Sequence, residues 1–311
     1  MIIDPIQQLK LIGFNNNLFE FVNMHKRNIL PNKILLTGKK GIGKSTFAYH
    51  FINYLFSYKE EFSYNMNEML INQYNRSYKL LLNNTHPNFF KVSLNSEKKS
   101  IDINQIREMI LFINKSTFDN NKKIILIDDV EYLNINAANS LLKSLEEPSE
   151  NTYFILIHNS SKKIIETIKS RCIEFKFFLN SSDVRTVVNN YFNDEIYDQL
   201  SNDFKYNLTS SFDFINLINL LNKYKLEIPS INVEFFLKYV ISNNLFKKEE
   251  FLKNNFKVFM EIFFKKKILL LKDMNIYNLY NYFNKKYYFV DKFNLDTESY
   301  LIEFNNKALN E

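Results

Sequence analysis

The chain of 311 residues has a single cysteine, Cys172, only four glycines and no tryptophan. One cysteine excludes an internal disulfide framework and any zinc site built from clustered cysteines. No run of 18 uncharged apolar residues occurs, and the N-terminus shows no basic segment followed by a long apolar one. The sequence therefore predicts a cytoplasmic protein without zinc, signal peptide or membrane segment.

The composition is that of a folded protein with a mildly basic surface. Hydrophobic residues make up 46% of the chain, which argues against disorder, and its length suits two or three domains. The formal net charge is +6. This charge permits contact with nucleic-acid phosphates, but it also fits an ordinary lysine-rich surface, so both interpretations stay open.

A codon bias makes some rare residues informative. Lys, Asn, Ile, Phe and Tyr are abundant, whereas Gly, Pro, Arg and Trp are scarce, as A/T-rich codons would give. We interpret this bias as genomic. Against it, three of the four glycines, Gly38, Gly41 and Gly43, fall within six residues.

Residues 1–178 alternate between strand-like and helix-like segments. Short apolar runs predict buried strands, and apolar residues at helical spacing predict the helices between them. The predicted strands are Lys33–Thr37, Phe89–Leu94, Lys123–Asp128, Tyr153–Ile157 and Ile173–Phe177. The predicted helices are Lys44–Phe56, one that follows a capping box at Asp102 and Gln105, and Asn136–Glu147. This alternation indicates an α/β fold with a mostly parallel sheet covered on both faces.

The rest of the chain is predicted to be helical, with a hinge at Pro229. The segments with helical periodicity are Asp183–Tyr191, Phe212–Leu221, Val233–Ile241 and Phe256–Leu271. Residues 58–84 are polar, Asn-rich and without a pattern, so we expect them to form a surface excursion.

The clustered glycines belong to a phosphate-binding loop of the pattern G-x-x-x-x-G-K-[ST]. The candidate nucleotide-binding residues are Gly38, Lys39, Lys40, Gly41, Ile42, Gly43, Lys44, Ser45 and Thr46. Glycines let backbone N–H groups converge on phosphates, and the following helix directs its positive end toward them. Lys44 would bind the β- and γ-phosphates, and the Ser45 hydroxyl would ligate Mg²⁺. The alternative is a loop that keeps this shape without binding nucleotide.

A second candidate lies at the end of the strand Ile124–Ile127. Asp128 can hold the hydration shell of Mg²⁺ there, as a Walker B aspartate does. ATPases of this class usually have Glu at the next position to activate water, but this chain has Asp129, which is one methylene shorter. The alternative is a strand end with two capping carboxylates.

Two motifs resemble those of bacterial clamp-loader subunits, which are AAA+ proteins. Asn139-Ser-Leu-Leu-Lys-Ser-Leu-Glu-Glu-Pro148 is similar to their NALLKxLEEP helix, and Thr167-Ile-Lys-Ser-Arg-Cys172 is similar to TIxSRC. Leu11-Ile12-Gly13 resembles the segment beside the adenine. Phe293-Asn-Leu-Asp296 resembles the "NLD" of the C-terminal helical domain in delta-prime subunits.

The resemblance implies ATP and Mg²⁺ as cofactors and gives roles to several residues. Arg171 would reach the γ-phosphate in a neighbouring subunit's site. In the chain's own site, Asn159 would be a polar sensor of the γ-phosphate and Ile12 would lie at the adenine. The lid stretch Ser210–Ile215 lacks the arginine that motor subunits usually carry. Together with Asp129, this absence argues against independent hydrolysis.

The resemblance also implies an architecture and partners. We expect an AAA+ domain over residues 1–178, a helical lid over 179–224 and a helical collar over 225–311. The expected role is that of a delta-prime-type subunit of the DNA polymerase III clamp loader, with gamma/tau and delta subunits, the sliding clamp and primed DNA as partners.

Two alternatives remain open. An active gamma/tau-like ATPase would share the phosphate loop, but such motors carry a four-Cys zinc module and Asp-Glu in the Walker B strand. A different AAA+ protein that handles DNA, such as a helicase loader or junction motor, would not carry the two clamp-loader motifs.

Overall fold

The computed structural model describes residues 4–95, 98–115, 122–149, 151–293 and 295–309. The chain folds into two compact units, Met1–Val187 and Val188–Glu311. The predicted separation of lid from collar would divide the second unit further, and that division stays a prediction.

The first unit contains one parallel five-stranded sheet. Its strands are β1 (Lys33–Gly38), β2 (Phe89–Val92), β3 (Lys123–Ile127), β4 (Thr152–Asn159) and β5 (Ile173–Lys176), in the spatial order β2-β3-β4-β1-β5. Strand β4 therefore lies between β1, which leads into the glycine-rich loop, and β3, which leads into Asp128. All strands are parallel, so both of these strand ends lie at the carboxyl edge of the sheet.

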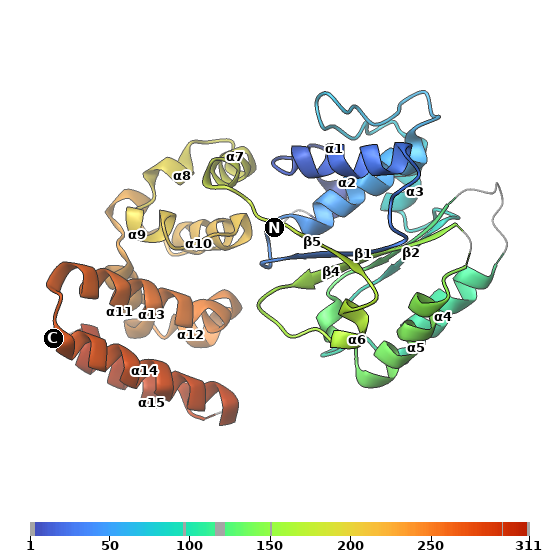
Figure 1. Cartoon of the computed structure of the whole chain (residues 1–311). Helices are drawn as coiled ribbons and strands as arrows, with labels where there is room; N and C mark the ends of the chain where they lie inside the picture. Colours follow the sequence, from blue (N-terminus) through green and yellow to red (C-terminus); the bar gives the residue numbers. More distant parts are fainter. Residues whose placement is uncertain (1–3, 96–97, 116–121, 150, 294, 310–311) are drawn as a thin grey trace. The chain divides into compact units, whose positions relative to one another are not determined.

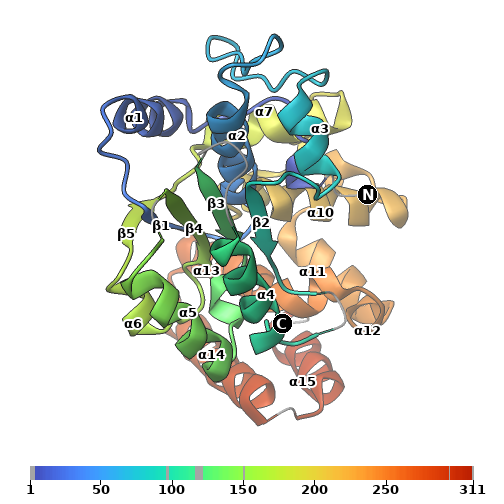
Figure 2. The same ribbon diagram turned by 90° about the vertical axis from the view of Figure 1, so that its right-hand side faces the viewer.

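Helices cover both faces of this sheet, as the sequence predicts (Figures 1 and 2). Helices α1 (Asn15–Lys26), α2 (Lys44–Ser57) and α3 (Arg76–Leu82) lie over one face, and α4 (Ile103–Asn114), α5 (Ile135–Glu146) and α6 (Glu166–Lys169) over the other. Alternation along the strands fills two cores: Ile34 and Leu36 point into the first, and Leu35 points into the second.

Local signals explain where several of these helices begin. The Asp102 carboxylate accepts hydrogen bonds from Asn104 N and Gln105 N and so caps α4, as predicted. The Gln105 side-chain oxygen, however, accepts from Ser93 N and ties the helix to the end of β2. The Asn134 side chain caps α5 by accepting from Ala137 N.

Residues 58–84 are not simply a surface excursion. They contain α3, and Tyr64, Met69 and Ile71 are buried in the same core as α2. The segment is bonded to the N-terminal residues, since Leu11 N donates to Met69 O (2.9 Å) and Ile71 N donates to Leu9 O (2.8 Å). The sequence pattern missed this because the apolar residues occur singly or in two short runs, Met69–Ile71 and Leu80–Leu82, with no helical or strand period.

The helices α7 (Ser181–Phe192) to α15 (Thr297–Phe304) follow the sheet. Between them lie α8 (Ile196–Gln199), α9 (Asn202–Lys205), α10 (Ser211–Lys223), α11 (Val233–Ser242), α12 (Leu245–Lys248), α13 (Glu250–Leu271) and α14 (Met274–Phe293). Short 3₁₀ segments occur at Pro5–Gln7, Val130–Tyr132 and Ile228–Ser230, and a π-helical turn at Asn305–Leu309. Asn232 is the residue that caps α11, by accepting from Phe235 N.

Aromatic rings contact one another in the core of the second unit, among buried aliphatic side chains. Phe259 is fully buried and contacts the rings of Phe204, Phe236 and Phe251, with centroids 4.9 to 6.2 Å apart. Further rings of this core are Phe256, Phe263, Phe264, Phe283, Tyr300 and Phe304. Such rings bury large areas and favour the edge-to-face geometry seen here.

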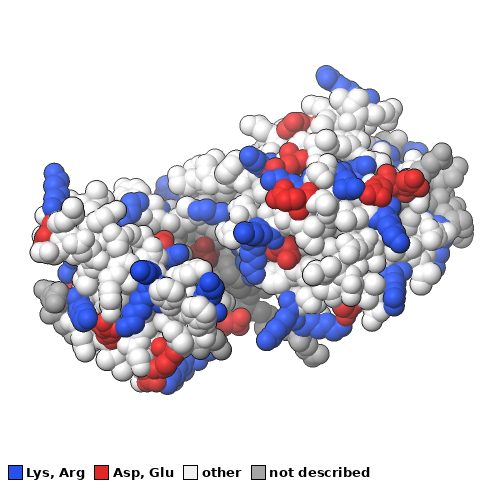
Figure 3. Space-filling view, turned by 60° about the horizontal axis from the view of Figure 1, so that its bottom comes forward, with Lys and Arg blue, Asp and Glu red and all other residues white. Residues whose placement is uncertain are grey.

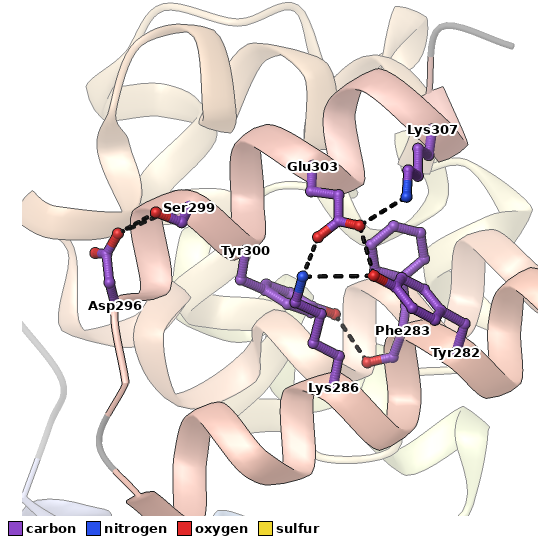
Figure 4. Close-up of polar contacts among 8 residues, drawn as sticks. All are labelled: Tyr282, Phe283, Lys286, Asp296, Ser299, Tyr300, Glu303 and Lys307. Carbon is purple, nitrogen blue, oxygen red and sulfur yellow. Dashed lines mark hydrogen bonds and ion pairs between the residues drawn. The ribbon is translucent and has the colours of Figure 1, made fainter.

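A polar cluster joins α14 to α15 at the surface of this unit (Figure 4). The Glu303 carboxylate accepts from the Tyr282 hydroxyl (2.6 Å), from Lys307 Nζ (2.9 Å) and from Lys286 Nζ. Hydrogen bonds from Lys286, Lys307 and Tyr282 lower the pKa of Glu303 to about 2. The cluster links the last helix to the preceding one outside their apolar contact.

Charges of both signs are mixed over the protein. On the face that Figure 3 shows, Lys and Arg side chains lie among Asp, Glu and uncharged residues. Among the residues that the structure describes, no helix is long and apolar enough to cross a membrane.

Candidate functional site

The glycine-rich loop joins β1 to α2 at the carboxyl edge of the sheet. Gly41 and Gly43 adopt left-handed backbone conformations, with φ values of 76° and 100°, which side chains disfavour. At Gly38 the constraint is space, because an added Cβ would lie 2.6 Å from Phe177 O and 2.7 Å from Ile42 Cδ1. The loop shape therefore depends on glycine at all three positions.

Lys44, the first residue of α2, is buried beneath this loop. Its Nζ donates to Gly38 O (2.9 Å) and to Lys39 O (2.7 Å). Burial lowers the pKa of Lys44 to about 8, although the Glu131, Asp128 and Asp129 carboxylates act in the opposite direction. The ammonium group is thus held at the loop, where a phosphate could exchange for the carbonyl contacts.

Ser45 and Asp128 meet across the site. Ser45 Oγ donates to Asp128 Oδ2 at 3.0 Å, and Asp128 N donates to Val92 O, which fixes the aspartate at the end of β3. Burial and the neighbouring Asp129 raise the pKa of Asp128. A hydroxyl beside a carboxylate provides the hard oxygen ligands that Mg²⁺ prefers, so the pair fits this ion.

The next carboxylates are arranged in a way that the sequence did not reveal. Asp129 has a left-handed backbone (φ 60°) that turns the chain into the 3₁₀ segment Val130–Tyr132. Glu131 lies two residues on, and its Oε2 accepts from Asn159 N at 3.2 Å. Its Oε1 is buried and makes no hydrogen bond within the described residues. The sequence analysis named Asp128 and Asp129 as candidates but not Glu131. Glu131 is brought to the site by this turn, which the sequence pattern does not show.

Asn159 ends β4 directly opposite Gly38 in the sheet register. Its Oδ1 accepts from Ser161 N (3.1 Å), while Ser160 N donates to Gly38 O (3.0 Å). The predicted sensor residue therefore lies at the same edge of the sheet as the phosphate loop. Its side-chain oxygen is engaged in a local turn.

The other predicted nucleotide-binding residues surround this loop. Ile12 is half-buried and precedes Gly13 and Phe14, both with left-handed backbones. A Cβ placed on Gly43 would lie 3.5 Å from the Phe14 ring, so the segment that contains Ile12 approaches the loop. Of the remaining residues, Ile42 is buried, Thr46 is half-buried, and Lys39 and Lys40 are exposed.

Arg171 lies elsewhere in the unit. It comes two residues before the start of β5, and Ile173 of β5 pairs with Ile34 near the start of β1. Arg171 is thus at the amino edge of the parallel sheet, whereas the phosphate loop is at the carboxyl edge. From this position it cannot serve the chain's own loop.

The guanidinium of Arg171 connects the two clamp-loader motifs. Its Nη2 and Nε donate to Glu146 Oε1 at 2.6 and 3.1 Å, and its Nη1 donates to Thr167 O at 2.9 Å. Glu146 is the last residue of α5, within the LEEP motif. Next to Arg171, Cys172 is a free, half-buried thiol whose pKa burial raises to about 11, so it is a poor nucleophile at neutral pH.

The lid stretch and the "NLD" segment each contain a residue that caps a helix. The Ser210 side chain caps α10 by accepting from Asp213 N (3.2 Å). Asp296 caps α15 by accepting from Glu298 N and Ser299 N. Asn294, the first residue of the predicted "NLD" motif, lies outside the described residues.

Sequence comparison finds relatives described as subunits of DNA polymerase III. The chain is 34% identical over 140 residues to the DNA polymerase III subunit delta' of Pseudomonas aeruginosa, which covers 45% of this chain and 41% of that protein. It is 30% identical over 97 residues to the delta' subunit of Escherichia coli (31% and 29% covered). The chain thus spans less than half the length of these curated relatives. A gamma subunit of Buchnera aphidicola also matches, with 38% identity over 96 residues (30% and 25% covered).

Structural comparison finds more distant similarities. A gamma subunit-related protein of Thermotoga maritima aligns with a TM-score of 0.39 and 16% identity, over 85% of this chain and 77% of that one. The RuvB branch migration motor of the same organism aligns with a TM-score of 0.42 and 14% identity (76% and 80% covered).

A family profile decides the relationship. The profile described as DNA polymerase III, delta subunit, matches residues 15–180, more than half of the chain. The match spans the sheet, the phosphate loop and both motifs that Arg171 connects. This chain belongs to the family described as DNA polymerase III, delta subunit, and two of the curated relatives similar to it are delta' subunits.

Proposed function

We propose that the chain acts in the cytoplasm as a delta'-type subunit of the DNA polymerase III clamp loader. In this role it assembles with gamma/tau and delta subunits and helps to place the sliding clamp on primed DNA. Family membership and the names of the relatives support this proposal. The observation that carries it further is the joining of the LEEP and SRC motifs through Glu146 and Arg171.

The phosphate loop supports ATP as the ligand of this subunit, with Mg²⁺. Backbone N–H groups from Gly41 to Ser45 would receive the phosphates, and Lys44 would bind them. Ser45 and Asp128 already contact each other and would hold Mg²⁺ and its waters. The bound ion would supply charge neutralisation at the phosphates, and Asn159 would contact the γ-phosphate at the same edge.

Arg171 is proposed to act in a neighbouring subunit. Its place at the amino edge of the sheet separates it from its own loop, and its side chain is one-third exposed. A guanidinium brought to another subunit's phosphates would offset charge that develops during phosphoryl transfer. To reach that site it would exchange its contact with Glu146.

A second candidate function is ATP turnover by this chain itself, as in a gamma/tau-like motor. The complete loop and the Ser45–Asp128 contact favour it. Asp129 is shorter than the usual glutamate and starts a tight turn, which opposes it. Phosphate release by the purified chain, compared with that of Lys44→Ala, separates the two candidate functions. If the wild type and the variant release phosphate at the same background rate, this subunit has a non-hydrolytic role.

The first test of the proposal is capture of native complexes with a tagged chain. We expect recovery of gamma/tau and delta subunits. We also expect Arg171→Ala to assemble normally while lowering ATP turnover at the neighbouring subunit's site by about 1,000-fold. Recovery of a helicase or of a homohexamer would contradict the proposal. Unchanged turnover of the Arg171→Ala complex would remove only the role given to Arg171.

A further inference from the structure

One basic residue under α2, the helix that follows the phosphate loop, has no role in the motifs discussed above. Lys91 lies in the middle of β2, where a buried parallel strand normally carries an apolar side chain. It is half-buried, and its Nζ lies 5.8 Å from the centre of the Tyr49 ring. A charged group at this position requires compensating partners.

The register of the sheet shows which partners are available. Lys91 pairs with Leu126 of β3, and Leu126 belongs to the core under α2, together with Tyr49. Side chains alternate along a strand, so Asp128, two residues after Leu126, continues on the same face. Lys91 and Asp128 are therefore diagonal neighbours on the face that α2 covers.

Helix α2 completes the arrangement from above. Ser45 and Tyr49 are four residues apart, so they lie on one face of this helix. Ser45 Oγ donates to Asp128, and the Tyr49 ring lies by Lys91. Ser45 and Tyr49 of α2 thus contact Asp128, which follows β3, and Lys91 of β2, respectively. Lys91 is therefore positioned by the same helix and strands that position the proposed Mg²⁺ ligands.

The charge of Lys91 is retained despite its burial. Burial acts to lower the pKa of Lys91, but the Tyr49 hydroxyl and the carboxylates of Asp128 and Asp4 outweigh it and raise the pKa above its ordinary value. A fixed cation therefore stands near Asp128, a carboxylate that would face the phosphates of a nucleotide.

We propose that Lys91 is a positioning residue that supplies a permanent positive charge beside Asp128, and that it thereby reduces the dependence of nucleotide binding on Mg²⁺. This inference rests on the proposed nucleotide site. Without Mg²⁺, Lys91 offsets the repulsion between carboxylates and phosphates; with Mg²⁺, it repels the ion. Both effects bring the affinities with and without the ion closer together.

The test compares the affinity of the full chain for a fluorescent ADP in Mg²⁺ and in EDTA, at matched ionic strength. The ratio of the two affinities measures the Mg²⁺ dependence. We expect Lys91→Met to increase this ratio about five- to tenfold, as expected when a nearby unit charge acting on a divalent ion is removed. Lys91→Arg keeps the charge and should leave the ratio near that of the wild type.

Two further variants separate charge from structure. Tyr49→Phe keeps the ring and removes the hydroxyl, so we expect a smaller change in the same direction. Lys122→Met is the matched control, because Lys122 also lies over a tyrosine ring, that of Tyr153 at 4.7 Å, and is paired with His25. It should leave the ratio unchanged. Thermal melting by circular dichroism verifies that each variant is folded.

The outcomes distinguish this inference from the proposed function. If the wild type binds no nucleotide in Mg²⁺ or in EDTA, the proposed nucleotide site is wrong and the inference is wrong with it. If the wild type binds and Lys91→Met has the same or a smaller ratio, only the inference is overturned. A change caused equally by Lys91→Arg would likewise overturn it, because the charge would then be irrelevant.

Discussion

The two units of the chain differ in how they bury their side chains. In Met1–Val187 a sheet separates a core rich in phenylalanine and tyrosine from a largely aliphatic one, and the carboxyl edge of the sheet carries buried polar residues such as Lys44 and Asn159. In Val188–Glu311 helices pack through groups of aromatic rings and aliphatic side chains, and the charged contacts described there lie at the surface. Chemistry is concentrated where strands end, and the helical unit provides packing and surface. Substitutions should therefore divide into two classes.

The largest effect is expected from emptying the aromatic core. Phe259→Ala removes a fully buried ring that contacts three others, and we expect a loss of about 3–5 kcal/mol in the stability of the second unit. Hydrogen exchange followed by mass spectrometry should show faster exchange in α9, α11 and α13. Phe259→Leu should lose less. Equal acceleration throughout the sheet of the first unit would show that the units do not unfold separately.

The next effect concerns the edge of the sheet. Lys44→Ala removes the ammonium group held by Gly38 O and Lys39 O, and we expect nucleotide affinity to fall by about 100-fold or more. Fluorescent ADP binding measures it. Exchange rates in the second unit should not change. A variant that binds nucleotide as well as the wild type would contradict the role given to the loop.

Helix caps allow a direct comparison of the two units, because a cap acts on the first turn of its own helix in either unit. Asp102→Ala removes the cap of α4 in the first unit, and Asn232→Ala removes that of α11 in the second. Each should cost about 1 kcal/mol in helix stability. Exchange of the first-turn amides checks this. A cost confined to one unit would mean that the surrounding core, and not the cap, sets the stability of these helix ends.

The smallest effect should be seen at the surface cluster of Glu303. Its pKa is lowered to about 2 by its contacts with Lys286, Lys307 and Tyr282, so its stabilising contribution is complete above its ordinary pKa of 4.5 and is lost as pH falls toward 2. Glu303→Gln should therefore melt at a lower temperature than the wild type at pH 7, by the equivalent of about 1 kcal/mol or less. The difference should shrink as pH falls through about 2 and disappear below that pH. A difference that persists there would have to come from packing.

The units also differ in how far the sequence predicts them. All five strands of the sheet were predicted, as were α2, α4 and α5, because continuous apolar runs and capping residues mark their positions. The loop, Asp128 and Asn159 each follow a predicted strand, and they lie at one edge because parallel strands end together. Glu131 and Lys91 were missed, since their importance arises from a turn and from a strand register that no local pattern encodes.

The helical unit was harder to predict for a related reason. Helix α13 begins at Glu250, six residues before its predicted start, and α14 and α15 were not predicted. Their apolar residues are largely Phe and Tyr, and many of the tyrosines in α14 are exposed, so burial does not follow a clean helical stripe. Which rings turn inward is decided by packing between helices that are distant in the sequence.

The contact between Arg171 and Glu146 has a consequence for how this sequence can change over evolutionary time. If Glu146 were lost, the guanidinium of Arg171 would keep its hydrogen bond to Thr167 O but lose its carboxylate partner. If Arg171 were lost, the Glu146 carboxylate would stand at the C-terminal end of α5, where the helix dipole disfavours a negative charge. Each position therefore constrains the other within a single chain. Two motifs separated by some twenty residues are, in physical terms, one unit of selection even before any neighbouring subunit imposes its own demands.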